Sequence, residues 1–132
     1  MKRVFVDTGA WYALADKRDP DHPAAARFFQ SNTHPLVTTN FIFDETITLL
    51  RTRLGWKAAA DFGQKIKSSR MVTVTAVNGD DENRGWELFL KFTDTDFSYT
   101  DCTSFAIMQR MKLDTTFSFD GHFAVMKFIV VP

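Results

Sequence analysis

Two kinds of apolar pattern alternate along the chain. Short runs rich in apolar and β-branched residues are typical of strands, and longer stretches with apolar residues three or four positions apart are typical of amphipathic helices. The short runs predict strands at residues 3–7, 36–39, 71–77, 115–119 and 127–131. The longer stretches predict helices at residues 10–15, 22–30, 41–54, 56–68, 81–92, 101–111 and 121–126. This alternation favours a largely parallel sheet covered by helices on both faces.

Local signals mark the ends of several predicted helices. Asn40 precedes the longest helix and is expected to be its N-cap, and Gly55 is expected to end it. The segment Asn78-Gly79-Asp80 predicts a turn after the third strand. Thr100 is expected to cap the helix that follows it.

Length and composition predict one domain that covers residues 1–132 and buries roughly two thirds of the surface of the unfolded chain. The fourteen phenylalanines allow a dense core without disulfides. The single cysteine, Cys102, has no partner in the chain, so we expect a reducing compartment, the cytoplasm. The apolar run before Asp7 is too short for a signal peptide or a membrane span, so we expect no membrane partner.

Sixteen basic residues balance sixteen acidic ones, which removes overall positive charge as an argument for nucleic-acid binding. Local basic clusters remain, one at residues 65–70 and one formed by Arg51, Arg53 and Lys57. Solvated helix faces are the commoner explanation for such clusters. If the chain binds RNA, Arg51, Arg53 and Lys57 are its candidate contacts.

Four acidic residues lie where segments of the chain change character. Asp7 follows the apolar strand Val4-Phe5-Val6, Glu45 lies inside the longest helix, Asp101 opens a helix, and Asp120 follows a strand. Ligands of open α/β sheets bind outside the carboxyl ends of the strands. Mg²⁺ and Mn²⁺ prefer carboxylate oxygens, and four convergent carboxylates repel one another unless a cation lies between them. The four acids therefore predict a pocket for one or two divalent ions, suited to hydrolysis of a phosphodiester bond.

Each acid also has an explanation that needs no metal. Asp7 fits a helix N-cap, Glu45 a solvated helix residue, Asp101 a first-turn acid favoured by the helix dipole, and Asp120 a turn residue before Gly121. All four of these explanations would have to hold at once, so together they account for the sequence less well than a shared metal site does.

Two polar residues near these acids are expected to lie outside the site. Asp96 lies near enough to Asp101 in sequence to be a fifth acid of the pocket, but a loop acid that contacts only water is the commoner case. His122 suits a general base or a ligand, but a surface histidine at the start of a helix is the commoner case.

Four segments around the acids resemble, in order, the acidic motifs of PIN-domain nucleases. The segments are Val4-Phe5-Val6-Asp7-Thr8, Phe43-Asp44-Glu45-Thr46, Ser98-Tyr99-Thr100-Asp101-Cys102 and Phe117-Ser118-Phe119-Asp120-Gly121-His122-Phe123. The resemblance spans nearly the whole chain and is closest to ribonuclease toxins of the VapC type. The last two segments are specific, whereas the first two are weak individually. Gly9 stands where many relatives have Ser, and residues 128–132 lack a glycine common before the last strand, but neither departure removes an acid.

The resemblance implies an α/β/α sandwich around a mostly parallel sheet and an endoribonuclease that depends on Mg²⁺ or Mn²⁺. It assigns the catalytic and metal-binding roles to Asp7, Glu45, Asp101 and Asp120. The hydroxyls of Thr8 and Ser118 would orient a carboxylate or a bound water.

The resemblance also implies partners. Relatives of the toxin type are generally homodimers, and a small antitoxin protein binds each one, commonly with a basic side chain in the acidic pocket. Four aromatic residues are candidates for the docking groove, although core packing is their commoner role: Trp11, Tyr12, Phe28 and Phe29.

Other classes of protein fit the sequence less well. A phosphatase of the haloacid-dehalogenase type needs a second Asp two residues after the first, where this chain has Gly9. A response-regulator receiver needs an Asp at the end of its third strand, where this chain has Val77-Asn78. A PIN-domain nuclease of RNA processing and an inactive RNA-binding or assembly module stay open, although the four acids argue against the inactive module.

Overall fold

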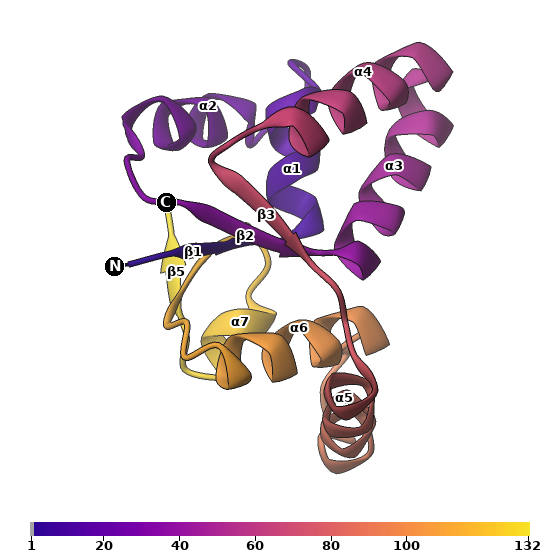
Figure 1. Cartoon of the computed structure of the whole chain (residues 1–132), viewed down its shortest axis with the longest axis vertical. Helices are drawn as coiled ribbons and strands as arrows, with labels where there is room; N and C mark the ends of the chain where they lie inside the picture. Colours follow the sequence, from indigo (N-terminus) through magenta and orange to yellow (C-terminus); the bar gives the residue numbers. More distant parts are fainter. Residues whose placement is uncertain (1) are drawn as a thin grey trace.

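A five-stranded sheet forms the centre of the protein (Figure 1). The computed structural model describes residues 2–132. The strands are β1 (Val4–Val6), β2 (Leu36–Thr39), β3 (Val72–Thr75), β4 (Thr115–Phe117) and β5 (Ile129–Val131). They lie in the order β3-β2-β1-β4-β5, and every neighbouring pair is parallel. The carboxyl ends of the strands therefore meet at one edge, with β1 in the middle.

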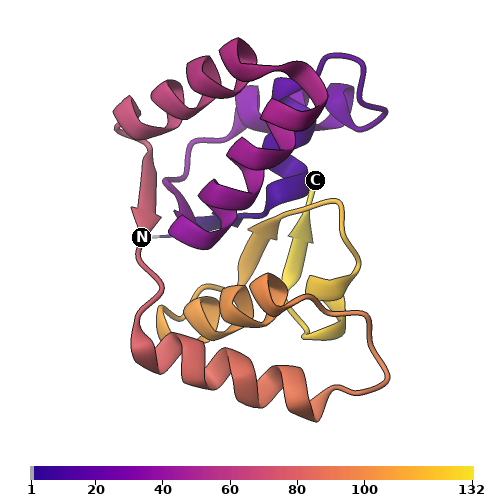
Figure 2. The same cartoon turned by 90° about the vertical axis from the view of Figure 1, so that its right-hand side faces the viewer.

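Within residues 2–132, seven helices cover the two faces of this sheet. One face carries α1 (Thr8–Ala15), α2 (His22–Ser31), α3 (Asn40–Leu54) and α4 (Trp56–Ser68), and the other carries α5 (Gly79–Lys91), α6 (Tyr99–Arg110) and α7 (His122–Val125) (Figures 1 and 2). This arrangement confirms the predicted α/β/α sandwich. None of these helices has the length and hydrophobicity that a membrane crossing requires.

The middle of the sheet is buried because helices cover it on both sides. The three residues of β1 are at most 2% exposed, and residues 102–108 of α6 are buried as well. Phe105 of α6 packs edge-on against Phe123 of α7, with ring centroids 5.1 Å apart. This packing fixes the start of α6, and with it Asp101, beside the carboxyl edge of the sheet.

Thr39, and not Asn40 as predicted, caps α3. The Thr39 hydroxyl oxygen accepts the N–H of Ile42 at 3.1 Å, because extended backbone at the end of β2 turns that side chain toward the helix. The Asn40 side chain instead accepts the N–H of Val77 at 2.9 Å and so joins α3 to the segment after β3. Gly55 ends the helix as predicted, with a φ of 99° that favours glycine.

Both α5 and α6 begin two residues earlier than predicted, each with a capping box. Asn78 caps α5 and Ser98, rather than Thr100, caps α6. In each helix the cap side chain accepts the N–H of the acid three residues on, and that acid, Asp81 or Asp101, accepts the N–H of the cap. A polar first turn is invisible to a search for apolar periodicity, which explains the late predicted starts.

A close backbone approach and an ion pair hold α5 against α6. A Cβ on Gly85 would lie 2.8 Å from Thr103 Cγ2 and 3.1 Å from Thr103 Cα. The Arg110 guanidinium donates to both carboxylate oxygens of Asp81, at 2.8 and 3.0 Å. Burial opposes ionisation of Asp81, but the hydrogen bonds from Arg110 and Asn78 outweigh it, so the pKa of Asp81 lies below its ordinary value.

The Gly85→Ala variant is expected to lose about 1 to 3 kcal/mol of unfolding free energy, because the backbone of α6 at Thr103 has to move away. Helix propensity alone predicts the opposite sign, since Ala is the better helix former. Gly79→Ala is the matched control, because a Cβ there meets nothing within 4 Å. Urea unfolding compares the three proteins. A Gly85→Ala protein as stable as the wild type would contradict the close approach.

Candidate active site

Asp7 lies at the carboxyl end of the central strand. β1 ends at Val6 and α1 begins at Thr8, two residues earlier than predicted, so the chain turns at Asp7. Asp7 occupies the N-cap position, but its side chain makes no capping hydrogen bond. The residue is only 7% exposed, and its carboxylate accepts the Ser118 hydroxyl at 3.2 Å. Helix capping therefore does not account for this buried carboxylate.

The environment of Asp7 favours its protonated form in the absence of a cation. Burial, together with the charges of Asp101 and Asp120, raises the pKa of Asp7 to about 7. The hydrogen bonds from the Thr8 backbone and the Ser118 hydroxyl act in the opposite direction and are too weak to cancel this effect. A positive ion in the pocket would oppose this shift, because it favours the charged form of the carboxyl group.

Glu45 reaches the same place from α3. Its carboxylate Oε1 accepts the Thr8 hydroxyl at 2.6 Å, so Thr8 of α1 holds a residue 37 positions away in sequence. Glu45 is otherwise exposed and lines the pocket, unlike its neighbour Asp44, which lies outside it. The two predicted hydroxyl residues thus each donate to one of the predicted acids, Thr8 to Glu45 and Ser118 to Asp7.

Asp101 and Asp120 meet around His122. The His122 Nδ1 atom lies 2.8 Å from Asp101 Oδ2 and 3.0 Å from Asp120 Oδ2. One potential ligand atom from each of these three residues lies within 4.8 Å of the others. Asp120 also accepts the backbone N–H of His122 at 2.8 Å, which fixes the turn into α7. Asp101 thus acts as a first-turn capping acid and as part of this cluster at once.

His122 begins α7 as expected, but the expectation that His122 and Asp96 lie outside the site was wrong. His122 is half-buried and lies inside the cluster, and its Nε2 atom lies 2.7 Å from Asp96 Oδ1. The loop acid therefore contacts the site rather than water alone. Burial lowers the pKa of His122, but the hydrogen bond with Asp96 and the charges of Asp120 and Asp101 outweigh it and raise that pKa above its ordinary value.

All four predicted acids line one pocket of about 730 Å³. The loop between α1 and α2 adds two acids that the sequence analysis did not single out, Asp19 and Asp21. Seven carboxylates in total line the pocket: Asp7, Asp19, Asp21, Glu45, Asp96, Asp101 and Asp120. Arg53 and His122 are the basic side chains among its described lining residues. This excess of hard oxygen donors fits Mg²⁺ or Mn²⁺.

The other predicted basic residues lie elsewhere. Arg51 lines a separate groove with Thr48, Thr52 and Trp56. Lys57 pairs with Asp61 of its own helix at 3.3 Å. Of the three RNA-binding candidates, Arg53 is the one in the acidic pocket.

The four aromatic residues that were candidates for partner docking lie in different parts of the structure. Trp11 is 2% exposed, and Phe28 packs against Phe117 with centroids 4.5 Å apart, as core residues do. Tyr12 lines the acidic pocket. Phe29 is 48% exposed and lines a groove between α1, α2 and α4.

Cys102 follows Asp101 but contributes no nucleophile. The residue is 0% exposed, and burial together with the Asp101 charge raises the pKa of its thiol to about 11. A thiolate is therefore not available near neutral pH.

The fold and the site together define an α/β protein with a parallel sheet and an acidic pocket at the carboxyl ends of its strands, where ligands of such sheets bind. The sequence model of the PIN domain matches residues 4–129, and the chain belongs to the PIN domain family.

Individual relatives agree with this assignment. The 23S rRNA-specific endonuclease VapC20 of Mycobacterium tuberculosis is 35% identical over 128 residues, which cover 97% of both chains. The crystal structure of VapC20, described as a sarcin-ricin loop cleaving toxin, superposes with a TM-score of 0.92 over 98% of this chain and 99% of that one. A VapC ribonuclease of Archaeoglobus fulgidus is 27% identical over 92% of this chain and 80% of its own. FitAcB of Neisseria gonorrhoeae, 12% identical, shares the fold with a TM-score of 0.74 over 98% of this chain and 96% of its own.

Proposed function

We propose that the protein is a divalent-metal-dependent endoribonuclease and the toxin of a type II toxin-antitoxin pair. The observation that carries the proposal is the convergence of Asp7, Glu45, Asp101 and Asp120 in one pocket, in a chain similar to VapC20 over nearly its full length. The same proposal places the protein in the cytoplasm, as one domain. A nuclease of RNA processing is the second candidate, because the acids alone do not distinguish it.

The four acids would hold Mg²⁺ or Mn²⁺, which, when bound, supplies a water of lowered pKa and neutralises charge on the phosphate. The remaining steps belong to the chain. Thr8 orients Glu45, and Ser118 orients Asp7, so that the carboxylates face the pocket without rearrangement. His122 holds Asp101 and Asp120 together from the side of α7. These contacts reduce the reorganisation that substrate binding would otherwise require.

We further propose a ribosomal RNA hairpin as the substrate, because VapC20 is named for 23S rRNA and for the sarcin-ricin loop. Incubation of the protein with a labelled sarcin-ricin hairpin tests the function. Cleavage at an internal site is expected with Mn²⁺ or Mg²⁺ and none with a chelator, and re-addition of the ion should restore it. An unrelated hairpin of equal length is the control for selectivity. Absence of cleavage of any RNA with either ion would contradict the proposal.

Binding of Mn²⁺ is expected to weaken about tenfold between pH 8 and pH 6. Below about pH 7 the Asp7 carboxyl of the metal-free protein holds a proton that the ion has to displace, so affinity falls as pH falls. Electron paramagnetic resonance of free Mn²⁺ gives the dissociation constant at each pH. Equal constants at pH 6 and pH 8 would show that Asp7 takes no part in binding.

We propose two protein partners. A small antitoxin would occupy the groove of about 460 Å³ between α1, α2 and α4, whose apolar wall includes Phe29 and Phe62.

A second copy of the chain would cover the exposed apolar side of α5. Trp86 is 51% and Leu90 58% exposed there, and Trp86 stacks on Phe89. Light scattering of the isolated protein distinguishes a dimer from a monomer.

A further inference from the structure

Arg53 stands out because it is one of two basic side chains among the described lining residues of a pocket with seven carboxylates, and the other, His122, is already paired with acids. It belongs to the last turn of α3 and lines the pocket together with Asp7, Glu45 and Asp120. A nucleic-acid strand that enters this pocket brings negative phosphates close to seven carboxylates. Metal ions relieve part of that repulsion, and a fixed cation on the wall relieves it at a defined position.

An aromatic support holds the Arg53 side chain in place. Its guanidinium carbon lies 5.0 Å from the centroid of the Tyr12 ring, a cation–π contact. Tyr12 is 6% exposed, and its hydroxyl donates to Asp16 Oδ2 at 2.6 Å, so the ring itself is fixed. A guanidinium that is already positioned loses little conformational freedom when it binds a ligand.

The guanidinium of Arg53 has no acidic partner in the described part of the chain; its polar neighbour there is the Tyr12 hydroxyl, which can engage only part of its five N–H donors. No carboxylate of residues 2–132 forms a salt bridge with it, whereas Arg110, Arg84 and Lys57 each pair with an acid. The remaining nitrogen–hydrogen donors therefore stay available to an anion. A planar guanidinium matches two oxygens of a phosphate, which a lysine ammonium cannot do in the same way.

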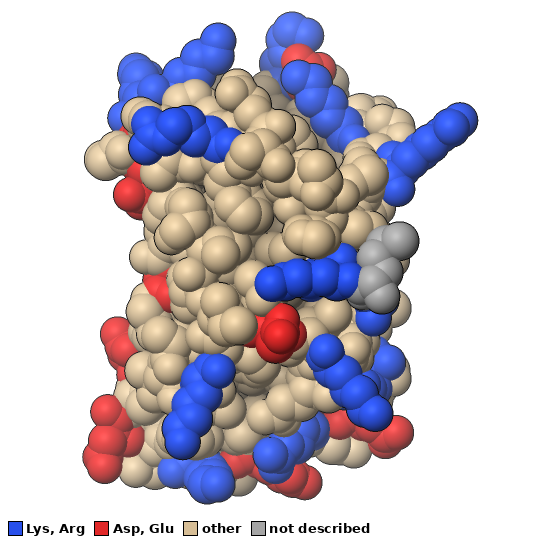
Figure 3. All heavy atoms as spheres, turned by 90° about the vertical axis from the view of Figure 1, so that its left-hand side faces the viewer, with Lys and Arg blue, Asp and Glu red and all other residues tan. Residues whose placement is uncertain are grey.

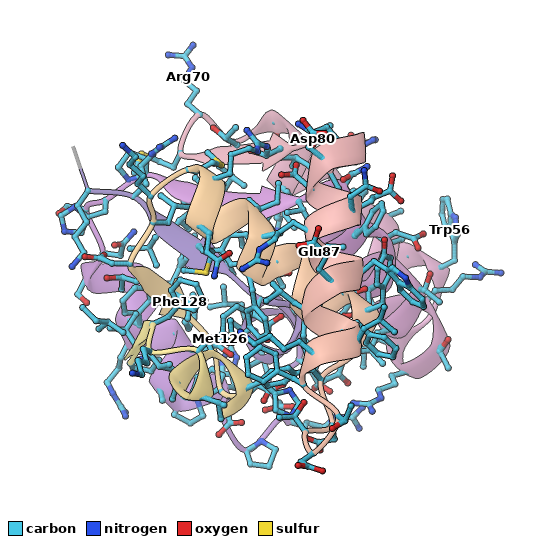
Figure 4. The ribbon with its side chains drawn as sticks, turned by 90° about the horizontal axis from the view of Figure 1, so that it is seen from below. Trp56, Arg70, Asp80, Glu87, Met126 and Phe128 are labelled. Carbon is cyan, nitrogen blue, oxygen red and sulfur yellow. The ribbon has the colours of Figure 1, made fainter. Side chains whose placement is uncertain are left out.

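On the side opposite to that of Figure 2, Lys and Arg lie mainly toward the two ends, and a few lie at mid-height beside an acidic side chain (Figure 3). A broad area without charged side chains separates the upper group from those at mid-height, so the basic side chains of this face form no continuous track. Near α3, the Arg51 groove is bordered by Trp56, which projects away from the body of the protein (Figure 4).

We propose that Arg53, supported by Tyr12, binds the non-bridging oxygens of an RNA phosphate inside the acidic pocket and so positions the strand over the carboxylates. This assignment rests on the proposed nuclease function and adds a substrate-binding residue to it. The four acids and their metal act on the scissile bond, and Arg53 fixes where the strand lies. Because it contacts a phosphate and no base, Arg53 contributes affinity and register rather than base selectivity.

The test compares the wild type with Arg53→Ala, Arg53→Lys and, as a control for lost charge, Arg27→Ala, which removes an exposed arginine from α2. With the RNA hairpin and Mn²⁺, Arg53→Ala is expected to lower kcat/KM by about 10- to 100-fold, mostly through KM. The slope of log KM against log salt should fall by about one. Arg53→Lys should recover part of the loss, and Arg27→Ala should match the wild type.

Two further measurements separate RNA binding from a structural role. Arg53→Ala should bind Mn²⁺ no more weakly than the wild type, because Arg53 is not an acid ligand, and its thermal midpoint should fall by no more than about 4 °C, because only the cation–π contact with Tyr12 is lost. Kinetics within about twofold of the wild type, or a loss that follows weaker Mn²⁺ binding or unfolding, would overturn the assignment.

A measurement of RNA binding by inactive variants distinguishes the proposed role of Arg53 from the proposed nuclease function. Hairpin affinity is compared between Asp7→Asn and Asp7→Asn/Arg53→Ala, neither of which is expected to cleave. Weaker binding of the double variant supports the role of Arg53, and equal binding refutes it. A wild type that cleaves no RNA would refute the nuclease function, whatever this arm shows for Arg53.

Discussion

The Asp7→Asn variant is expected to cleave RNA at least about 1,000-fold more slowly than the wild type and yet to be more stable without metal. Cleavage is lost because the neutral amide cannot replace a buried carboxylate as a ligand. Stability rises because the wild type, on folding near neutral pH, has to protonate Asp7 or bury its charge, and the side chain is only 7% exposed. The Asn side chain retains an oxygen that accepts the Ser118 hydroxyl, so the local structure is kept.

The sign and the pH window of this stability effect follow from the pKa of Asp7. Its pKa is about 7 in the folded protein and 3.8 in an ordinary environment, so between these values the folded state holds a proton that the unfolded state has lost. The stability of the metal-free wild type therefore falls as pH rises from about 4 to about 7, by at most roughly 4 kcal/mol. Asp7→Asn lacks this group, so its advantage should be largest at pH 8 and should nearly vanish at pH 4.

Thermal unfolding with and without Mn²⁺ measures both the stability of the metal-free proteins and the loss of the metal ligand in Asp7→Asn. Mn²⁺ should raise the midpoint of the wild type and change that of Asp7→Asn little, because a ligand stabilises only the state that binds it. A metal-free Asp7→Asn protein that is less stable than the wild type at pH 8 would show that the carboxylate contributes to folding, and would contradict the account of its burial.

The second large effect is expected at Glu45. Glu45→Gln should lower the cleavage rate by about 100- to 1,000-fold, because it removes a pocket carboxylate while the amide oxygen still accepts the Thr8 hydroxyl. The control is Asp44→Asn, which neutralises the adjacent acid on the same helix outside the acidic pocket. Single-turnover cleavage at saturating Mn²⁺ compares the two variants. Equal losses of cleavage rate in both variants would show that the effect comes from the net charge near α3 and not from the loss of a metal ligand.

The layered fold could be predicted because short apolar and β-branched runs alternate along the chain with longer segments that have apolar residues at helical spacing. Val4-Phe5-Val6 reads as a buried strand, and it lies at the centre of the sheet. The helix starts were predicted less well. Ser98 and Asn78 begin helices through hydrogen bonds with acids three residues on, and these polar first turns carry no apolar signal.

The site was predicted as a set of acids, but its internal contacts depend on tertiary structure. His122 and Asp96 are 26 residues apart and meet only because α7 and the loop before α6 lie at the same edge of the sheet. The close spacing of Asp120 and His122 in a turn was a local signal that favoured a shared role. Arg53 could not be separated from Arg51 by sequence, because only the folded helix shows which of the two is next to Tyr12.

The central claim is that one metal-loaded acidic pocket cuts RNA, and a single titration tests it. Mn²⁺ is added to chelator-treated protein at pH 8, while metal binding and cleavage of the labelled hairpin are followed in the same samples. Cleavage should be absent without the ion and should rise with occupancy of the pocket, and Asp7→Asn should show neither tight binding nor cleavage. Cleavage by the metal-free wild type, or full occupancy without cleavage, would contradict this claim.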